Sequence, residues 1–334
     1  MLAQRISSIN SISAICDATG ADVDEVAQAI GADPRIGNKF LQAGIGFGGS
    51  CFKKDVLSLV YLAETLILPE VATYWRSVIE INEWARDRFV TRVIKSLHNT
   101  LSGKKVTLFG YAFKKDTNDT RESPTLDIIR SLEAENPREI ALFDPCCTVS
   151  QMSDEINRFV GHNVLKMNGG PVSVYADAYA ACEGAEAVLI VTAFEEFGNS
   201  PKGNDLAIPI RQEARLSDPR PFERSEPTEN ELLALSAYLR HSERDVDSDS
   251  NDPLQRFNPV PPCPGNCPDC EAERTTGTKG YGASNEHVAK QRLDWKKIYS
   301  QMRKPHWVFD GRGVLDIAVM EKIGFRVQSV GRQR

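Results

Sequence analysis

The chain contains 334 residues, of which 41% are hydrophobic and 26% are charged, and its formal net charge is -6. This composition is typical of a globular protein in water, and the length allows two domains, or one domain with an appendage. Two classes are excluded, because a nucleic-acid-binding protein would need a basic face and a membrane protein would need a long apolar run.

The compartment that the sequence favours is the cytoplasm. Residues 1–20 lack the charged-then-apolar order of a signal peptide. The eight cysteines are mostly scattered, which suits a reducing compartment better than a disulfide scaffold. We therefore expect a cytoplasmic protein.

The chain opens with two predicted helices. Apolar residues recur at helical spacing over residues 2–17, and Gly20 predicts the end of this helix. Asp22 and Glu25 form a capping box that predicts a short second helix. The first helix begins at Met1 without a cap, as the middle of a longer helix would.

Two more helices are predicted in the next part of the chain. One runs from Cys51, and the other covers about 70–99 and is opened by Pro69. Both carry apolar stripes of the kind that usually pack into a core. The residues expected to be buried are Val56, Leu59, Val60, Leu62, Val71, Trp75, Val78 and Ile79.

The segment between the second and third helices carries the strongest sign of chemistry. Residues 44–49 are dense in glycine, which lets backbone N–H groups approach a ligand closely. Ser50 is a good N-cap, which would place Cys51 in the first helical turn. There the helix dipole and Lys53 and Lys54 would favour a thiolate. Asp55 lies one turn further on the same helical face.

A single cysteine is most often a small buried apolar residue, and glycines also serve tight turns. The combination of a glycine loop, a cap, two lysines and a carboxylate around Cys51 is far less common by chance. The sequence therefore favours a reactive Cys51 over a structural one.

After Gly103 the chain alternates between strands and helices. Strands are predicted at 105–110, 140–143, 164–167, 187–192, 306–310 and 325–329. Helices are predicted at 124–134, 177–183, 293–302 and 314–322. The fold class is thus α/β, with a helical region followed by a doubly wound parallel sheet of Rossmann-like type.

Residues 198–290 interrupt this alternation. They are rich in Pro, Ser, Asp and Glu, so we expect them to be largely disordered, with one short helix at 228–240. Cys263, Cys267 and Cys270 could hold zinc with a histidine as the fourth ligand. A complete zinc site normally has two separated pairs of ligands, so the sequence favours free thiols and no metal site.

Two loops follow predicted strands, where open α/β sheets bind ligands. The loop at 113–123 carries Lys114, Lys115 and Arg121 beside a helix N-terminus, a pattern that suits phosphate or pyrophosphate. A solvated charged turn is the alternative for such a run. Arg312 follows the strand at 306–310 and offers a fork-shaped donor.

The segments 46–55, 35–41, 56–61 and 113–123 together resemble the UDP-glucose/GDP-mannose dehydrogenase family, and the flanks of Cys51 favour its UDP-glucose-oxidising members. The resemblance covers about 2–197 and 293–331. It implies a central helical dimerisation region at 1–100 and a UDP-binding α/β domain at 101–197 plus 291–334, separated by the insertion at 198–290. It also implies a homo-oligomer formed through the central helices.

The resemblance assigns roles to individual residues. UDP-glucose would be contacted by Arg35, Gln42, Ala43, Gly44, Ile45, Gly46, Phe47, Phe113, Lys114 and Arg312. NAD would be contacted by Cys51, Phe52, Lys53, Lys54 and Arg121. In the family the counterpart of Arg35 acts across the dimer interface, and Gln42 replaces a common lysine.

The mechanism that the resemblance implies is the oxidation of the C6 alcohol of the sugar by two hydride transfers to NAD. Cys51 would form a thiohemiacetal and then a thioester, which water hydrolyses while Asp55 orients the reacting groups. The family's N-terminal dinucleotide-binding domain has no counterpart here, because no Gly-x-Gly-x-x-Gly motif follows a strand. We therefore expect a polypeptide of these residues not to act as a dehydrogenase by itself.

Two alternatives remain at this point. The chain could belong to a dehydrogenase of GDP-mannose or of an N-acetylated UDP-sugar, because such enzymes share the Gly-Cys core. It could also be a non-catalytic fragment that binds a nucleotide-sugar or dimerises with an intact relative.

Overall fold

The structure is a computed structural model that describes residues 1–199 and 292–332. The predicted helix at 228–240 and the cysteines at 263, 267 and 270 lie outside these ranges. None of the helices in the described part combines the length and the apolar character that crossing a membrane requires.

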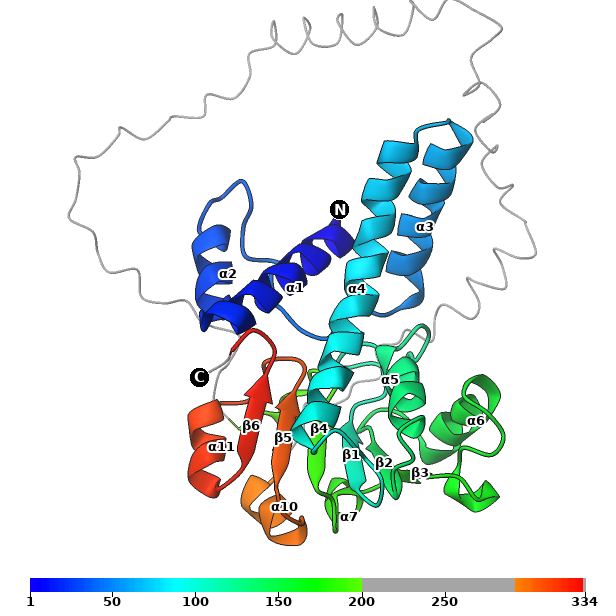
Figure 1. Cartoon of the computed structure of the whole chain (residues 1–334), viewed down its shortest axis with the longest axis vertical. Helices are drawn as coiled ribbons and strands as arrows, with labels where there is room; N and C mark the ends of the chain where they lie inside the picture. The colour runs from blue at the N-terminus through cyan, green and yellow to red at the C-terminus, as the bar shows by residue number, and fades with distance from the viewer. Residues whose placement is uncertain (200–291, 333–334) are drawn as a thin grey trace, which may run out of the picture. The chain divides into compact units, whose positions relative to one another are not determined.

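Four helices form the first part of the chain (Figure 1): α1 (Leu2–Thr19), α2 (Val23–Gly31), α3 (Ser50–Thr65) and α4 (Pro69–Ser96). As predicted, α1 ends at Gly20, which has a φ of 78°. The Asp22 side chain accepts a hydrogen bond from the backbone of Asp24 and caps α2.

The predicted cap of α3 is wrong. Ser50 is already helical, and Gly49 is the N-cap residue, with a φ of 88° and no side-chain hydrogen bond. The loop enters the helix through a left-handed backbone conformation that glycine adopts without strain. A serine at position 49 would be strained in this conformation. The helix therefore begins at Ser50 itself, one residue earlier than a Ser50 cap would place it.

The apolar stripes of α3 and α4 are only partly buried. Val56, Val60 and Ala63 pack inward from α3, but Leu59 and Leu62 are 41% and 53% exposed. Val71 of α4 is 43% exposed. The prediction that these three side chains are buried is wrong for the single chain. Because α3 and α4 pack against each other, each buries only the side that faces the other helix. Figure 1 shows that α3 and the first half of α4 stand away from the sheet, so their other sides stay exposed.

The second part of the chain is built on a parallel six-stranded sheet with the order β3-β2-β1-β4-β5-β6, which confirms the predicted doubly wound fold. The strands are β1 (Lys105–Phe109), β2 (Glu139–Phe143), β3 (Val172–Tyr175), β4 (Ala187–Ile190), β5 (Trp307–Asp310) and β6 (Arg326–Ser329). The strand order reverses between β1 and β4, and this is where such sheets bind ligands.

Short helices connect the strands: α5 (Pro124–Glu133), α6 (Val149–Phe159), α7 (Ala178–Cys182), α10 (Trp295–Gln301) and α11 (Ile317–Ile323), with 3-10 turns η1 (Lys166–Asn168) and η2 (Glu195–Phe197). The predicted strand at 164–167 is wrong. Those residues lead into η1, and the strand that pairs with β2 is β3. α6 was not predicted, although Met152 and Ile156 face inward at helical spacing.

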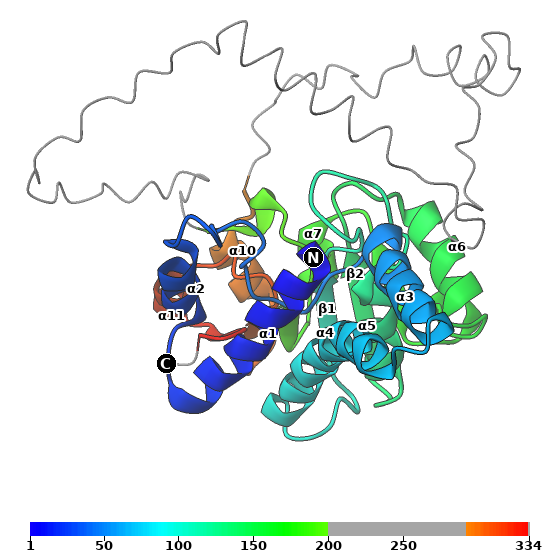
Figure 2. The same ribbon diagram turned by 90° about the horizontal axis from the view of Figure 1, so that it is seen from above.

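The sheet and the helical part share α4. Its last turns contribute Phe89, Val90 and Val93 to the same core as β1, β4 and β5. Figure 2 shows the molecule from above, with α1, α3 and α4 lying over the sheet. The loop that joins α2 to α3 is thereby brought to the carboxyl ends of the strands.

Candidate active site

The glycine-rich loop lies across the carboxyl ends of three strands. The Ile45 N–H donates to the carbonyl of Gly311, just after β5, at 3.0 Å. The Gly49 N–H donates to the carbonyl of Glu122, in the loop after β1, at 3.2 Å. Arg312 Nη1 donates to the Gly46 carbonyl at 2.7 Å and its Nε to the Val191 carbonyl, just after β4, at 2.8 Å. The loop therefore spans the point where the strand order reverses.

Two glycines of this loop are required by the closeness of the contact. A Cβ at Gly46, whose φ is 98°, would lie 2.7 Å from Asn82 Oδ1. A Cβ at Gly49 would lie 2.9 Å from the Phe113 ring. These distances are shorter than van der Waals contact. A side chain at Gly46 would push the loop away from α4, and one at Gly49 would push it away from the loop after β1.

Cys51 lies in the first turn of α3, and it is an exposed free thiol. Asp55 is exposed one turn later, and its Oδ1 is 3.6 Å from Lys54 Nζ. The structure thus places Cys51, Lys54 and Asp55 on the open side of the helix, directly after the loop.

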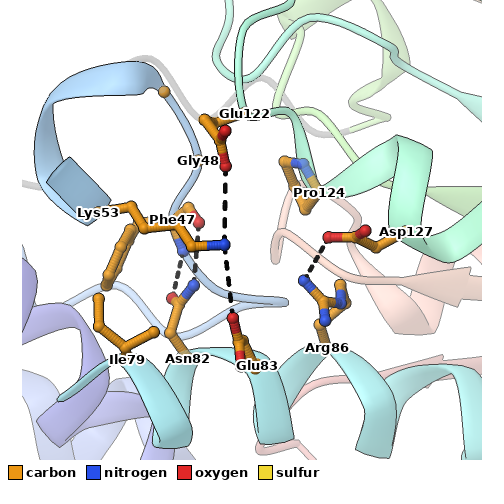
Figure 3. Close-up of a pocket in the computed structure, with 11 residues that line it drawn as sticks. Phe47, Gly48, Lys53, Ile79, Asn82, Glu83, Arg86, Glu122, Pro124 and Asp127 are labelled. Carbon is orange, nitrogen blue, oxygen red and sulfur yellow. Dashed lines mark hydrogen bonds and ion pairs between the residues drawn. The ribbon is translucent and has the colours of Figure 1, made fainter. Parts of the chain in front are cut away.

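The other two residues of this turn have internal partners. Lys53 Nζ lies 3.5 Å from Glu83 of α4 and 3.7 Å from Glu122 (Figure 3). The Phe52 ring packs edge-on against Phe47, with ring centroids 5.5 Å apart. Both side chains hold α3 against its neighbours.

Arg121 lies near Cys51, and most of its side chain is exposed to solvent. It pairs with Asp119 at 2.7 Å while 72% of its side chain stays exposed. The hydrogen bond to Asp119 raises the pKa of Arg121, and the charge of Cys51 adds a smaller effect in the same direction. The same hydrogen bond lowers the pKa of Asp119.

Phe113 and Lys114 meet the loop from the end of β1. The Phe113 ring lies beside Gly49, and Lys114 Nζ is 5.3 Å from the centre of that ring. Lys115 points elsewhere and pairs with Glu195 at 2.8 Å. Of the two neighbouring lysines, Lys114 is therefore the one whose ammonium group lies near the Phe113 ring that borders the loop.

Arg312 is enclosed between the loop and the strand ends. Desolvation lowers its pKa to about 10, against an opposing effect of Asp310. Its Nη2 is buried without a hydrogen-bond partner in the described part of the chain. Asp310 is fully buried and accepts from the backbone N–H groups of Arg312, Gly313 and Leu315 at 2.8–2.9 Å, which fixes the turn that carries the guanidinium.

Gln42 joins the site through its Nε2, which is 3.3 Å from the Arg312 carbonyl. Arg35 does not join it within one chain, because its guanidinium pairs with Asp33 at 2.5 Å and 87% of its side chain is exposed. Its predicted action across a dimer interface stays a prediction.

Sequence reasoning missed two asparagines that hold the loop. Asn10 Oδ1 of α1 accepts from the Gly44 N–H at 2.8 Å. Asn82 of α4 bonds both polar groups of Phe47. The available signal was that each asparagine is a polar amide beside the apolar stripe of its helix. The spacing of the residues did not indicate which part of the chain either amide would contact.

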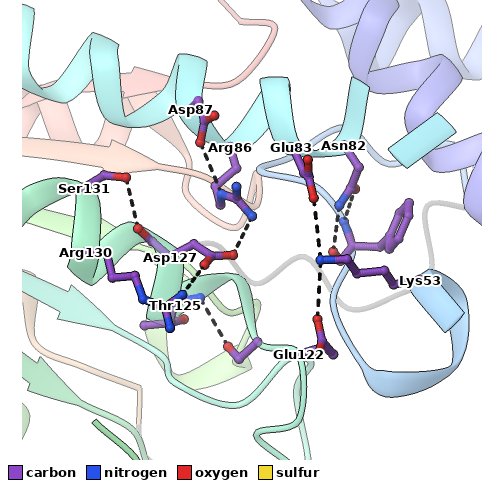
Figure 4. A network of polar contacts seen from close by, with 12 residues as sticks. Lys53, Asn82, Glu83, Arg86, Asp87, Glu122, Thr125, Asp127, Arg130 and Ser131 are labelled. Carbon is purple, nitrogen blue, oxygen red and sulfur yellow. Dashed lines mark hydrogen bonds and ion pairs between the residues drawn. The ribbon is translucent and has the colours of Figure 1, made fainter. Parts of the chain in front are cut away.

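A polar pocket lies under the loop between α3, α4 and α5 (Figure 3). Arg86 of α4 bonds Asp127 of α5 at 2.7 Å, and Lys53 joins Glu83 to Glu122 (Figure 4). These pairs connect three helices and the loop after β1. The described residues contain no cluster of three side chains suited to a metal ion.

Comparison with known proteins gives consistent matches. Residues 1–84 match the profile for the UDP-glucose/GDP-mannose dehydrogenase family, central domain, and residues 107–218 match that family's UDP binding domain. The UDP-glucose 6-dehydrogenase of Caenorhabditis elegans is 52% identical over 196 residues, which are 59% of this chain and 40% of that protein. UDP-glucose 6-dehydrogenase 4 of Oryza sativa is 35% identical over 99% of this chain and 51% of that protein.

Among solved structures, a UDP-glucose dehydrogenase from Pyrobaculum islandicum has a TM-score of 0.50 and 29% identity, over 59% of this chain and 41% of that one. A UDP-D-ManNAc dehydrogenase from Pyrococcus horikoshii has a TM-score of 0.55 and 17% identity, over 99% and 49%. The second likeness concerns the fold alone. The chain spans about half or less of the length of these relatives.

Proposed function

Because the chain belongs to the UDP-glucose/GDP-mannose dehydrogenase family, we propose that it supplies the nucleophile and the sugar-nucleotide site of a UDP-glucose 6-dehydrogenase. The observation that carries the proposal is an exposed Cys51 in the first turn of α3, reached through a loop fixed across the ends of β1, β4 and β5. In this arrangement the thiol stands where an open α/β sheet binds its ligand.

The nucleotide-sugar is held by groups from the strand ends. Arg312 offers a buried Nη2 without a partner among the described residues, and an acceptor oxygen of the ligand would satisfy it. Lys114 and Phe113 provide a cation and an aromatic face beside the loop. The loop from Gln42 to Phe47 lies along the sugar, and Arg35 reaches the site of a second copy.

Cys51 performs the covalent step. Its thiolate adds to the carbonyl carbon of the C6 aldehyde, a C–S bond forms, and the carbonyl oxygen takes up a proton to give a thiohemiacetal. At the thioester stage, the oxygen of a water attacks the same carbon and the C–S bond breaks. The product leaves as a carboxylate, the sulfur stays on Cys51 as a thiolate, and the two protons of the water pass to solvent. Asp55, one turn along α3, orients groups around this carbon.

The residues around Cys51 partly fit NAD, which when bound supplies the electron acceptor for both oxidations. Lys54 and Arg121 are exposed cations beside Cys51 and suit its diphosphate. Lys53 fits less well, because its ammonium group lies between Glu83 and Glu122. We propose that Lys54 and Arg121 contact the cofactor, and that Lys53 mainly holds α3.

We further propose that residues 1–100 form a central dimerisation region, and that residues 101–197 with 291–334 form the UDP-binding domain. The strands β1 to β6, which lie between Lys105 and Ser329, form one parallel sheet, and this proposal assigns that sheet to the binding of UDP. We also expect the active protein to act in the cytoplasm.

The test is isothermal titration calorimetry with UDP-glucose, GDP-mannose and UDP-N-acetylglucosamine. The proposal expects UDP-glucose to bind at least tenfold more tightly than the other two. Preference for another nucleotide-sugar would indicate a different member of the family. No binding of any of the three would contradict a nucleotide-sugar site in this chain.

A further inference from the structure

Asn82 lies in the middle of α4 and points its side-chain amide at the loop (Figure 3). The Phe47 N–H donates to Asn82 Oδ1 at 2.7 Å, and Asn82 Nδ2 donates to the Phe47 carbonyl at 3.1 Å. One side chain thereby satisfies both backbone polar groups of a residue that lies four positions before Cys51.

The contact is tight as well as polar. A Cβ on Gly46 would lie 2.7 Å from Asn82 Oδ1 and 3.0 Å from the Asn82 carbonyl oxygen, so the loop backbone rests directly on α4. The loop then needs only Gly48 and Gly49 to reach Ser50, the first residue of α3. A displacement at Phe47 therefore passes to the turn that carries Cys51.

The same stretch of α4 also contacts the other supports of the site (Figure 4). Glu83, next to Asn82, pairs with Lys53 of α3 at 3.5 Å. Arg86, one turn later, pairs with Asp127 of α5 at 2.7 Å. Asn82 is the neutral member of this row, and it is the one that bonds the loop backbone.

We propose that Asn82 is a positioning residue: it fixes the loop conformation at Phe47 and so sets where Cys51 stands relative to a bound UDP-glucose. This inference rests on the proposed function. An amide is needed because it presents a donor and an acceptor together. An aspartate offers only acceptors when ionised, and it would face the Phe47 carbonyl with negative charge.

The first test compares Asn82→Ala with Asn199→Ala in the full chain. Asn199 forms the same pair of hydrogen bonds with a different backbone, accepting from the Asp316 N–H at 2.6 Å and donating to its carbonyl at 3.0 Å. Both variants lose two hydrogen bonds, so similar losses of thermal stability are expected. We expect Asn82→Ala to raise the Kd for UDP-glucose at least tenfold, and Asn199→Ala to leave it within about twofold.

The second test is the pH dependence of Asn82→Asp. A protonated aspartic acid presents one donor and one acceptor, as the amide does. The charged groups that line the pocket with Asn82 are Lys53 of α3, Glu83 and Arg86 of α4, Glu122 of the loop after β1, and Asp127 of α5. We expect the Kd ratio between this variant and the wild type to fall several-fold from pH 7.5 to pH 5, while Asn199→Asp shows no such recovery.

The outcomes separate this inference from the proposed function. If wild-type protein does not bind UDP-glucose, the proposed function fails. If the wild type binds and the Asn82→Ala protein, folded by circular dichroism, binds equally well, only the positioning role is overturned. Equal weakening by the two alanine variants would show a general loss of stability and would also overturn it.

Discussion

At the scale of single residues, the site depends on side chains that serve the backbone of one loop. Arg312, Asn82 and Asn10 all bond main-chain groups between Gly44 and Phe47. Such contacts cannot be predicted from the sequence. The motif locates the loop in the chain, but it does not identify the distant side chains that bond the loop backbone. Cys51 itself was predicted from its neighbours, although the predicted Ser50 cap is wrong.

Gly46 gives a residue-scale prediction with an internal control. Gly46→Ala should lower the free energy of unfolding by about 2 kcal/mol or more, because it combines backbone strain with a clash against Asn82. Gly20→Ala has the same left-handed strain but no heavy atom within 4 Å of the new Cβ, and should cost about 1 kcal/mol. Urea denaturation measures both. Equal losses in the two variants would show that the close contact with Asn82 is not present.

At the scale of elements, the sequence located every strand except β3 within a residue or two. β1 and β4 are buried at every position, and β4 is a continuous apolar run. β3 was misplaced because residues 164–167 offered a competing apolar run, whereas only Val172 of the four β3 residues is buried. α6 was missed although the signal was present: Val149, Met152, Ile156 and Phe159 recur at helical spacing behind the Thr148 N-cap.

The cluster that links β1, β2 and β3 gives a pH prediction. Burial alone would raise the pKa of Glu139, but the hydrogen bond from Tyr175 and the charges of Lys105 and Lys166 outweigh it and lower the pKa. A lowered pKa in the folded state means stability that is present above the unfolded pKa and is lost as pH falls through the folded one. Burial and Glu139 raise the pKa of Tyr175 to about 12, so its contribution is lost as pH rises from about 10 through that value.

We therefore expect Tyr175→Phe to make the chain less stable at pH 7, with a smaller loss of stability between pH 7 and pH 3 than the wild type shows. Thermal unfolding followed by circular dichroism across this range measures both effects. If Tyr175→Phe and the wild type lose the same stability between pH 7 and pH 3, the hydrogen bond from Tyr175 does not lower the pKa of Glu139. Phe143→Leu, a change in a neighbouring side chain of β2 that does not titrate, is the control.

At the scale of the whole molecule, the exposed apolar side chains of α3 and the turn after it need a partner. Leu62, Leu66 and Ile67 are 53%, 57% and 85% exposed, and Tyr61 beside them is 72% exposed. Apolar surface gathered on one pair of helices is typical of an interface between subunits. The sequence placed dimerisation in this region through the family resemblance, and no contact within one chain could have established it.

We predict that the protein is a dimer or a larger oligomer, and that Leu62→Glu with Leu66→Glu converts it to monomers. Sedimentation velocity measures the change in mass. Met167→Glu is the matched control, because Met167 is also apolar and 81% exposed but lies in η1, away from α3 and α4. An oligomer that persists in the double variant, or a monomeric wild type, would contradict the assignment.

The central claim is that the Cys51 thiol faces a bound sugar nucleotide, and the alkylation of cysteines by iodoacetamide tests it most directly. Mass spectrometry can follow each cysteine separately, with buried Cys16 and Cys182 as internal references. We expect Cys51 to react much faster than these two, and saturating UDP-glucose to slow its reaction at least tenfold. If UDP-glucose leaves the rate at Cys51 unchanged, in protein shown by calorimetry to bind it, then the Cys51 thiol does not face the bound sugar nucleotide.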